Sequence, residues 1–183
     1  MNSFDIFNLS KPLQNAIVDL GFEKPTPIQA ETFSVILSGK DVVGIAQTGT
    51  GKTFAYMLPT LQGLKFSEQI TPRVLVLVPT RELVIQMVEM IESFAKYVNV
   101  RVLGVYGGVN ITPQKDAVAL GSDVLVATPG PLFDLAVSQV LKLRDVNKLV
   151  IDEVDVMLDL GFIYQLTSIF NMLKPRRQNI MFS

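Results

Sequence analysis

The chain has 183 residues, of which 49% are hydrophobic, and this predicts one domain with a well-filled core. It contains no Cys and no His, which excludes disulfides, thiolate or imidazole metal sites and imidazole bases. Any catalytic proton transfer must therefore use carboxylates or water. Sixteen Lys and Arg against seventeen Asp and Glu give a formal charge of −1. This balance argues against broad coating by nucleic acid and leaves room for a short phosphate track.

Short apolar, β-branched runs alternate with longer amphipathic segments along the chain. Strands are expected at residues 42–45, 74–78, 100–106, 124–127, 149–151 and 179–182. Helices are expected at residues 12–20, 28–37, 53–63, 82–97, 113–120, 132–140 and 164–173. The apolar runs are continuous, which is typical of strands buried on both faces. We therefore predict a three-layer α/β fold with a mostly parallel central sheet between helices.

The two ends of the chain carry further information. The first nine residues include Asp5 and lack a basic region and a long apolar stretch, so we expect no signal peptide. No run of about 18 uncharged apolar residues occurs, so we expect no membrane span and a soluble, monomeric, cytoplasmic domain. The last apolar run stops at Ser183, where a strand delivers its end to a site, so we expect a piece of a larger protein.

A phosphate-binding loop follows the first expected strand. Gly49 and Gly51 allow a tight turn whose N–H groups point at phosphate oxygens, and the next helix adds the partial positive charge of its N-terminus. Lys52 can reach the terminal phosphates, and the Thr53 hydroxyl can ligate Mg²⁺. A glycine-rich turn without a ligand is the alternative. The predicted nucleotide-binding loop comprises Ala46, Gln47, Thr48, Gly49, Thr50, Gly51, Lys52 and Thr53.

An acidic pair, Asp152 and Glu153, ends the expected strand 149–151. Asp152 can hold Mg²⁺, usually through water, and Glu153 can polarise the water that attacks a γ-phosphate. Such a pair is also common at helix N-termini, where it serves only as a favourable charge. Because it accompanies a phosphate-binding loop, we interpret it as catalytic. Together the two motifs predict a nucleotide hydrolase or a kinase.

Further motifs follow one another in a recognisable order. They are residues 21–29 with an isolated Phe4 upstream, 46–53, 79–83, Gly107 with Gly108, 128–130, 152–155 and 158–162. Over residues 4–183 this order resembles the first RecA-like domain of the DEAD-box ATP-dependent RNA helicases. The resemblance makes residues 1–183 one ATP-binding helicase domain, with the adenine-reading Q motif at residues 4–29. It also accounts for Ala46, where the general phosphate-loop pattern has Gly.

The resemblance implies adenine recognition by the Q motif. Gln29 carries an amide that both donates and accepts, as the adenine edge requires. Phe22 is expected to stack on the base and Lys24 to pack or hydrogen-bond beside it, which favours ATP over GTP. Simple core packing is the alternative for Phe22. For Phe4, stapling of the N-terminal segment is the alternative to a role in the nucleotide site.

The resemblance also implies an RNA surface built from strand-end loops. Helix N-termini, small hydroxyls and backbone N–H groups suit phosphate and 2′-hydroxyl contacts that do not read bases. An ordinary surface charge is the alternative for Arg81. The expected RNA-binding residues are Pro79, Thr80, Arg81, Gly107, Gly108, Thr128, Pro129 and Gly130.

The sequence departs from the family pattern at two positions. Val154 stands where the family has Ala, which adds bulk beside the carboxylates and keeps every charge. Asp155 is retained, and we expect it to belong to the catalytic site. In the family this residue links the site to a Ser-Ala-Thr motif, and of that motif only Ser183 is present here. Pro131 stands where the family has Arg. It suits the first turn of the helix expected at 132–140 and cannot make the charged RNA contact, so it represents either a tolerated helix start or weakened RNA binding.

The function that the resemblance implies is ATP and Mg²⁺ binding, as the N-terminal half of an enzyme that hydrolyses ATP to bind and locally unwind RNA. Lys52, Asp152, Glu153 and Asp155 are the expected catalytic residues, and Thr53 and Asp152 the expected metal ligands. RNA and a second RecA-like domain are the expected partners. An ATP-dependent RNA clamp that does not unwind, and a kinase or ATPase acting on a small molecule, are the alternatives.

Overall fold

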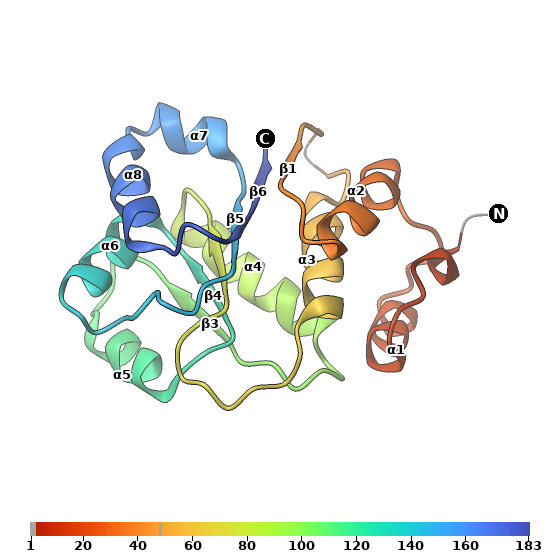
Figure 1. Cartoon of the computed structure of the whole chain (residues 1–183), viewed down its shortest axis with the longest axis horizontal. Helices are drawn as coiled ribbons and strands as arrows, with labels where there is room; N and C mark the ends of the chain where they lie inside the picture. The colour runs from red at the N-terminus through yellow and green to blue at the C-terminus, as the bar shows by residue number, and fades with distance from the viewer. Residues whose placement is uncertain (1–2, 48) are drawn as a thin grey trace.

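The computed structural model describes residues 3–47 and 49–183, which form a parallel sheet of six strands between two layers of helices (Figure 1). The sheet order is β1-β6-β5-β2-β4-β3. The strands are β1 (Val42–Gly44), β2 (Val74–Leu77), β3 (Val102–Val105), β4 (Val124–Ala127), β5 (Lys148–Ile151) and β6 (Gln178–Phe182). All pairings among the described strands are parallel, so the predicted α/β architecture is confirmed.

Two groups of helices cover the two faces of the sheet. One face carries a 3₁₀ helix η1 (Phe4–Phe7), α1 (Lys11–Asp19), α2 (Pro27–Leu37), α3 (Lys52–Gly63) and α4 (Arg81–Phe94). The other carries α5 (Thr112–Leu120), α6 (Pro129–Val137), α7 (Val154–Asp159) and α8 (Ile163–Met172). Of the helices described here, none is both long and apolar enough to cross a membrane.

The central strands build both cores because their side chains alternate between the faces. In β2, Val74 and Val76 belong to the core under α1–α4, while Leu75 and Leu77 belong to the core under α5–α8. All four are fully buried, and each contributes roughly 1.5–3 kcal/mol of transfer free energy. This two-sided burial explains why the sequence shows continuous apolar runs instead of alternation.

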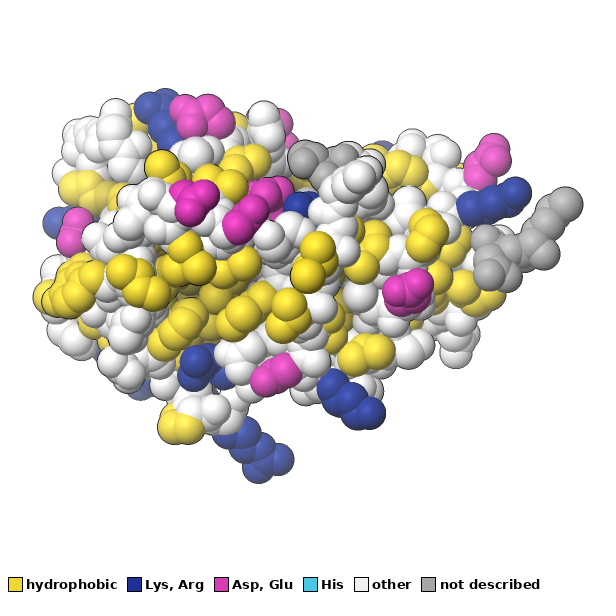
Figure 2. Space-filling model, turned by 90° about the horizontal axis from the view of Figure 1, so that it is seen from above, with side chains coloured by type: hydrophobic (Ala, Val, Ile, Leu, Met, Phe, Trp, Pro, Cys, Tyr) yellow, Lys and Arg dark blue, Asp and Glu magenta, His cyan; other side chains and the backbone are white. Residues whose placement is uncertain are grey.

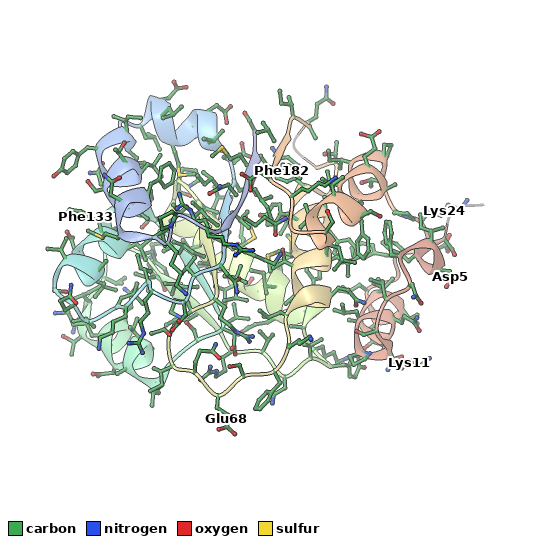
Figure 3. The ribbon with its side chains drawn as sticks, in the orientation of Figure 1. Asp5, Lys11, Lys24, Glu68, Phe133 and Phe182 are labelled. Atoms are coloured by element: carbon green, nitrogen blue, oxygen red, sulfur yellow. The ribbon has the colours of Figure 1, made fainter. Side chains whose placement is uncertain are left out.

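The edge strand β1 is held close to β6 by a small residue. A Cβ atom on Gly44 would lie 2.4 Å from the ring of Phe182, so only glycine fits opposite this side chain. Phe182 itself is fully buried and points inward from the end of β6 (Figure 3). The strand that precedes the phosphate-binding loop is therefore fixed in register against the last strand.

Every expected strand and helix is present, and the largest shift occurs in α6. This helix begins at Pro129 instead of at residue 132, because Thr128 is extended and its carbonyl accepts from Leu132 N at 3.3 Å. It ends at Val137 instead of at residue 140, since Gln139 adopts a positive φ of 60°. Pro131 nevertheless lies in the first turn, as predicted. The elements η1 and α7, of 4 and 6 residues, were not expected, because they are too short to show a helical period.

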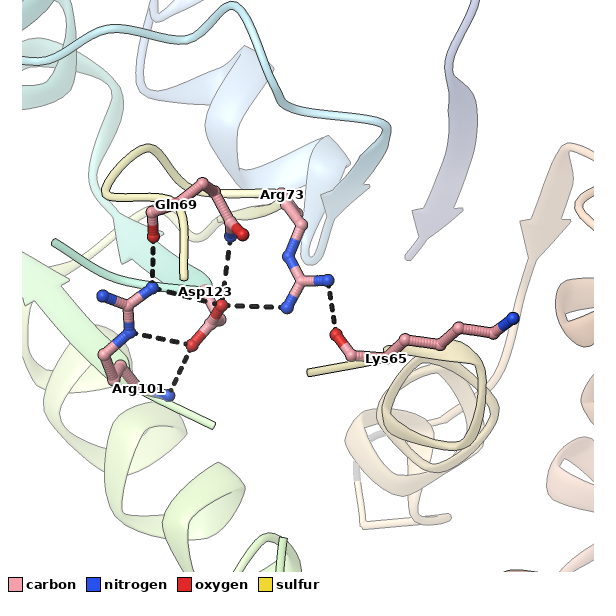
Figure 4. A network of polar contacts seen from close by, with 5 residues as sticks. All are labelled: Lys65, Gln69, Arg73, Arg101 and Asp123. Atoms are coloured by element: carbon pink, nitrogen blue, oxygen red, sulfur yellow. Dashed lines mark hydrogen bonds and ion pairs between the residues drawn. The ribbon is translucent and has the colours of Figure 1, made fainter. Parts of the chain in front are cut away.

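A buried carboxylate ties together the amino ends of three strands (Figure 4). Asp123 precedes β4, is 5% exposed, and pairs with Arg73 before β2 at 2.9 Å and with Arg101 before β3 at 3.0 Å. It also accepts from the Gln69 amide at 3.1 Å, and Arg73 donates to the Lys65 carbonyl. The network therefore anchors the connection between α3 and β2 to the sheet.

We predict that Asp123→Asn lowers the free energy of unfolding by about 3 kcal/mol at neutral pH, because two guanidinium groups lose their buried counter-charge. Burial raises the pKa of Asp123, but hydrogen bonds from Arg101 and Arg73 outweigh it, and the pKa lies below its ordinary value of 3.8. The carboxylate thus stabilises the fold above 3.8, and this contribution disappears as the pH falls through the lowered pKa.

Urea unfolding of parent and variant near pH 7 and again well below 3.8 measures the effect. The difference between the two proteins should shrink in acid. Asp116→Asn, on the exposed side of α5, is the control and should change stability by less than about 0.5 kcal/mol. A difference that stays constant with pH would contradict the role of the charge.

Candidate nucleotide and RNA site

The parallel strands lead into most of the predicted site residues at one edge of the sheet, while the Q-motif residues precede β1 and reach the site from η1, α2 and the connection before α2. At their carboxyl ends β1 leads into the phosphate-binding loop and β5 into Asp152, while β2, β4 and β3 lead into the predicted RNA residues. Because the order is β1-β6-β5-β2-β4-β3, the two groups occupy adjoining stretches of this edge. In the view toward this edge, hydrophobic side chains gather in the middle of the surface, with acidic and basic groups around them (Figure 2).

The phosphate-binding loop is a compact turn. Gly49 and Gly51 have φ values of 84° and 82°, a conformation that glycine adopts without strain. The Thr50 hydroxyl donates to the Gln47 carbonyl at 2.7 Å, and Ala46 N donates to the Ser183 carbonyl at 3.1 Å. Gly51 is the N-cap of α3, so the helix begins directly at Lys52. Thr48 lies outside the described residues.

Lys52 and Glu153 form the central ion pair of the site. Lys52 Nζ lies 3.0 Å from Glu153 Oε1, and the two side chains are 7% and 25% exposed. Glu153 has a φ of 54°, the left-handed region that is unfavourable for a residue with a Cβ. This conformation at the N-cap of α7 turns the chain so that Glu153 faces the loop on the neighbouring part of the edge. The acidic pair and the phosphate-binding loop are thus brought together as predicted.

Asp152 is held by a tyrosine that sequence reasoning did not single out. The Tyr56 hydroxyl donates to Asp152 Oδ2 at 2.7 Å, and Glu153 N donates to Oδ1 at 3.0 Å. Burial raises the pKa of Asp152, while the Tyr56 hydrogen bond and the Lys52 charge oppose this rise. The pKa of Tyr56 lies well above its usual value because of burial and then the Asp152 charge, and the Thr53 side chain opposes that shift. Thr53 and Asp152 therefore both lie beside one phenol.

Gln29 connects the Q motif to the phosphate-binding loop. Its Oε1 accepts from Thr26 N at 3.0 Å, which is one of the two contacts of a capping box at the start of α2. Its Nε2 donates to the Gly51 carbonyl at 3.3 Å, and a Cβ on Gly51 would lie 2.4 Å from this nitrogen. One N–H of the amide remains for another acceptor. The conformation of the loop is thus coupled to the side chain that is predicted to read adenine.

Aromatic rings form the wall beside the Q motif. Phe54 on α3 makes edge-to-face contacts with Phe4 at 5.6 Å, Phe22 at 5.2 Å and Phe94 at 4.6 Å between ring centroids. Phe4 is buried and also contacts Phe7, which favours the stapling interpretation for its side chain. Phe22 is 46% exposed, so one side of its ring is accessible to a stacking partner.

These groups line one pocket of about 480 Å³, the size of a small-molecule site. The predicted residues in its wall are Phe4, Phe22, Lys24, Gln29, Gly49, Thr50, Gly51, Lys52, Thr53, Asp152 and Glu153. Ala46 and Gln47 are not among the lining residues. Asp155 also lies outside the pocket, on the exposed side of the first turn of α7, where interaction with the Ser183 side chain lowers its pKa. The structure therefore associates Asp155 with the end of β6, and its catalytic role stays a prediction.

The predicted RNA residues converge at the ends of β2, β3 and β4. Thr80 caps α4 by accepting from Leu83 N at 3.3 Å, and Arg81 lies over the Tyr106 ring at 5.2 Å. Arg81 Nη1 is 3.8 Å from where a Cβ on Gly108 would lie, and the Pro131 ring is 3.4 Å from the same position on Gly107. Pro79 and Thr128 are buried, Pro129 and Gly130 open α6, and Tyr106 is a member of this group that the motifs did not reveal.

The site's donor set suits a hard cation. Thr53 and Asp152 supply oxygen atoms, and within residues 3–47 and 49–183 no group of three acidic side chains is placed so that it could hold a metal ion by itself. Magnesium typically uses one or two protein oxygens and takes its other ligands from water and substrate phosphates. The residues present therefore fit Mg²⁺ held together with a nucleotide.

Comparison with known proteins agrees with this geometry. A family model described as DEAD/DEAH box helicase matches residues 26–183. The chain belongs to the DEAD/DEAH box helicase family. Pro131, at the position where the resemblance leads us to expect Arg, lies against Gly107. Val154 is only partly buried in the first turn of α7, so its extra methyl groups are accommodated without displacing Asp152 from Tyr56.

Three similar relatives show how much of a longer protein this chain matches. The chain is 43% identical over 182 residues to the pre-mRNA-processing ATP-dependent RNA helicase prp-5 of Neurospora crassa, covering 96% of this chain and 15% of that protein. It is 43% identical over 180 residues to the DEAD-box ATP-dependent RNA helicase CshA of Streptococcus pneumoniae, covering 98% and 34%. It is 40% identical over 182 residues to the ATP-dependent RNA helicase DeaD of Buchnera aphidicola, covering 99% and 30%. The chain thus spans about a third or less of each relative's length.

We predict that Tyr56→Phe lowers the free energy of unfolding by about 2 kcal/mol, because Asp152 loses a buried charge-assisted hydrogen bond. Chemical denaturation measures the change. Tyr164→Phe is the matched control, since Tyr164 is 68% exposed, and it should change stability by less than about 0.5 kcal/mol. Equal stabilities of the two variants would show that the Tyr56–Asp152 contact does not support the site.

Proposed function

We propose that this chain is the ATP-binding first RecA-like domain of an ATP-dependent RNA helicase, which hydrolyses ATP to bind and locally unwind RNA. The observation that carries the proposal is the single pocket lined by both the Q-motif side chains and the catalytic groups Lys52, Asp152 and Glu153. A triphosphate on the loop places its base toward Phe22 and Gln29 and its terminal phosphate toward the acidic pair. The names of the relatives, all ATP-dependent RNA helicases, support the same assignment.

Lys52 changes partner when phosphate binds. In the free protein its ammonium is neutralised by Glu153 at 3.0 Å. A γ-phosphate carries more negative charge than one carboxylate, so Lys52 turns to it, and Glu153 becomes free to accept a proton from the attacking water. Thr53 and Asp152 would hold Mg²⁺, which when bound would supply positive charge beside the phosphates. The exchange couples nucleotide binding to activation of the base.

Adenine selectivity rests on the remaining N–H of Gln29 and on its accepting oxygen. Thr26 N and Gly51 O fix the orientation of the amide before any nucleotide is present. A fixed amide favours the base whose edge has the complementary pattern, and the exposed ring of Phe22 adds stacking. The proposed preference is therefore for ATP over GTP.

RNA binding is assigned to the neighbouring stretch of the same edge, where Thr80, Arg81, Gly108 and the start of α6 converge. These groups offer a guanidinium, hydroxyls and close backbone approach, which suit the sugar–phosphate chain. A second RecA-like domain completes the RNA surface and supplies arginines to the γ-phosphate. Turnover consequently requires both domains.

We predict that the full-length protein shows RNA-stimulated ATP hydrolysis and that Glu153→Gln reduces it by about 100-fold or more, because the water loses its base. Affinity for ATP should stay equal or become tighter in this variant, since Lys52 no longer has to leave a carboxylate. Steady-state turnover with and without RNA and a fluorescent-nucleotide titration measure the two effects.

Glu92→Gln, an exposed change on α4, is the control and should leave both quantities unaltered. The isolated 183 residues should turn over ATP barely and should not unwind duplexes. Robust RNA-stimulated turnover by the isolated chain would overturn the requirement for two domains. ATP-dependent RNA binding by the full-length parent without turnover would replace the helicase with the RNA clamp.

We predict that Pro131→Arg strengthens RNA binding by the full-length protein, because it adds a cation beside Gly107. One added phosphate contact steepens the dependence of log affinity on log salt by about 0.7 for a single strand. Titrations with single-stranded RNA at several salt concentrations measure it. Val137→Arg adds the same charge at the far end of α6 and should leave the slope unchanged. Equal slopes for both variants would show that Pro131 is only a tolerated helix start.

A further inference from the structure

A second cleft, of about 490 Å³, lies at the opposite edge of the sheet, where the strands begin. The amino ends of β2, β5 and β6 are neighbours there, because β5 pairs with both other strands. Five cationic residues from these strand starts and from the connection after α3 line the cleft: Lys65, Arg73, Lys148, Arg176 and Arg177. No carboxylate is found in this lining, all of which lies within the described part of the chain.

The nearby carboxylates neutralise only part of this charge. Asp123 pairs with Arg73, and Asp41 lies close enough to Arg177 for that charge to help lower its pKa, after hydrogen bonds from Asn179. Glu68, in the same connection as Lys65, points away from the body of the domain (Figure 3). Among the described residues, Lys65, Lys148 and Arg176 have no ion-pair partner.

Two details indicate that the cleft is incomplete without an anion. Lys148 is partly buried at the start of β5, and burial lowers its pKa. Among the described residues its amine donates only to the neutral amide of Gln178. An ammonium buried without a counter-charge is costly unless an anion joins it. In addition, Arg73 Nε is buried and has no hydrogen-bond partner, although the two other nitrogens of its guanidinium donate to Asp123 and to the Lys65 carbonyl.

We propose that this cleft binds an anion that carries clustered phosphate groups. Guanidinium and ammonium groups gathered in one cleft can donate to several phosphate oxygens at once, and three cations without an ion-pair partner attract a multiply charged anion more strongly than a singly charged one. The ligand is either a free oligophosphate or consecutive phosphates of an RNA strand, which present the same chemistry. The cleft lies at the other end of the strands from the nucleotide pocket and shares no lining residue with it.

The experiment uses the protein in a Lys52→Ala background, so that the phosphate-binding loop does not contribute. Calorimetric titration with inorganic tripolyphosphate measures binding, and Lys65→Ser with Arg176→Ser removes two exposed, unpaired cations from the cleft. We expect the double variant to bind tripolyphosphate at least about tenfold more weakly, because two cationic hydrogen-bond donors are lost. Lys11→Ser with Lys115→Ser, on α1 and α5, removes the same charge elsewhere and should leave binding unchanged.

A second variant separates binding from folding. Lys148→Met should keep the melting temperature in phosphate-free buffer equal or raise it, because the buried charge is removed, and should still weaken tripolyphosphate binding. Displacement of tripolyphosphate by a short single-stranded RNA would identify the RNA backbone as the ligand; no displacement would identify a free oligophosphate. Equal binding by the cleft and control double variants, or no binding in the Lys52→Ala background, would overturn the proposal.

Discussion

The parallel pairing of β5 between β6 and β2 determines where each functional side chain lies. Parallel strands all point one way, so their carboxyl ends meet at a single edge of the sheet. After each strand the chain must return to the other edge, and here it does so through helices that cover one face or the other. The phosphate-binding loop after β1 and the acidic pair after β5 are separated by only one strand, β6, although about 100 residues lie between them in sequence. A shift of one residue in the register of β5 would turn Asp152 away from Tyr56 and would move the side chains of β5 from one core to the other. Burial on both faces therefore fixes the register.

Within that frame the nucleotide pocket is organised before a ligand arrives. Gln29 is held at both ends of its amide, Asp152 receives hydrogen bonds from Tyr56 and Glu153 N, and Lys52 is neutralised by Glu153. Each contact satisfies a polar group that burial would otherwise penalise. The strained φ of Glu153 is compatible with the same arrangement, because the ion pair with Lys52 helps to offset its cost. In the proposed mechanism a ligand exchanges these partners, which requires less reorganisation than building the site anew.

The sequence predicted the strands, the long helices and the pocket residues that belong to motifs, because two-sided burial and phosphate chemistry leave local patterns. Tyr56 escaped prediction because it lies among apolar residues of α3 and looks like a core position; its only signal is a hydroxyl three residues after Thr53. Tyr106 and the Asp123 network depend on strand order, which brings together residues that are distant in sequence. The displacement of α6 reflects the extended backbone of Thr128 and the proline that follows it at the first helical position, which start the helix earlier than the apolar period suggested. For Asp155 the motif predicted a place in the site, but the side chain does not line the pocket, because membership of a motif does not by itself decide where a side chain lies.

Charge is segregated between the two edges of the sheet, which a net charge of −1 conceals. At the carboxyl edge, the cation Lys52 is balanced by an acidic partner, and the phosphate binding proposed there relies on backbone N–H groups and a helix N-terminus. At the amino edge the cations outnumber nearby carboxylates, and one of them, Lys148, is buried at the start of the same strand that ends in Asp152. Electrostatic recognition within a Debye length depends on such local excesses and not on the total. A nearly neutral domain is therefore compatible with two separate phosphate sites that use different physical means, one built from backbone dipoles and the other from side-chain charge.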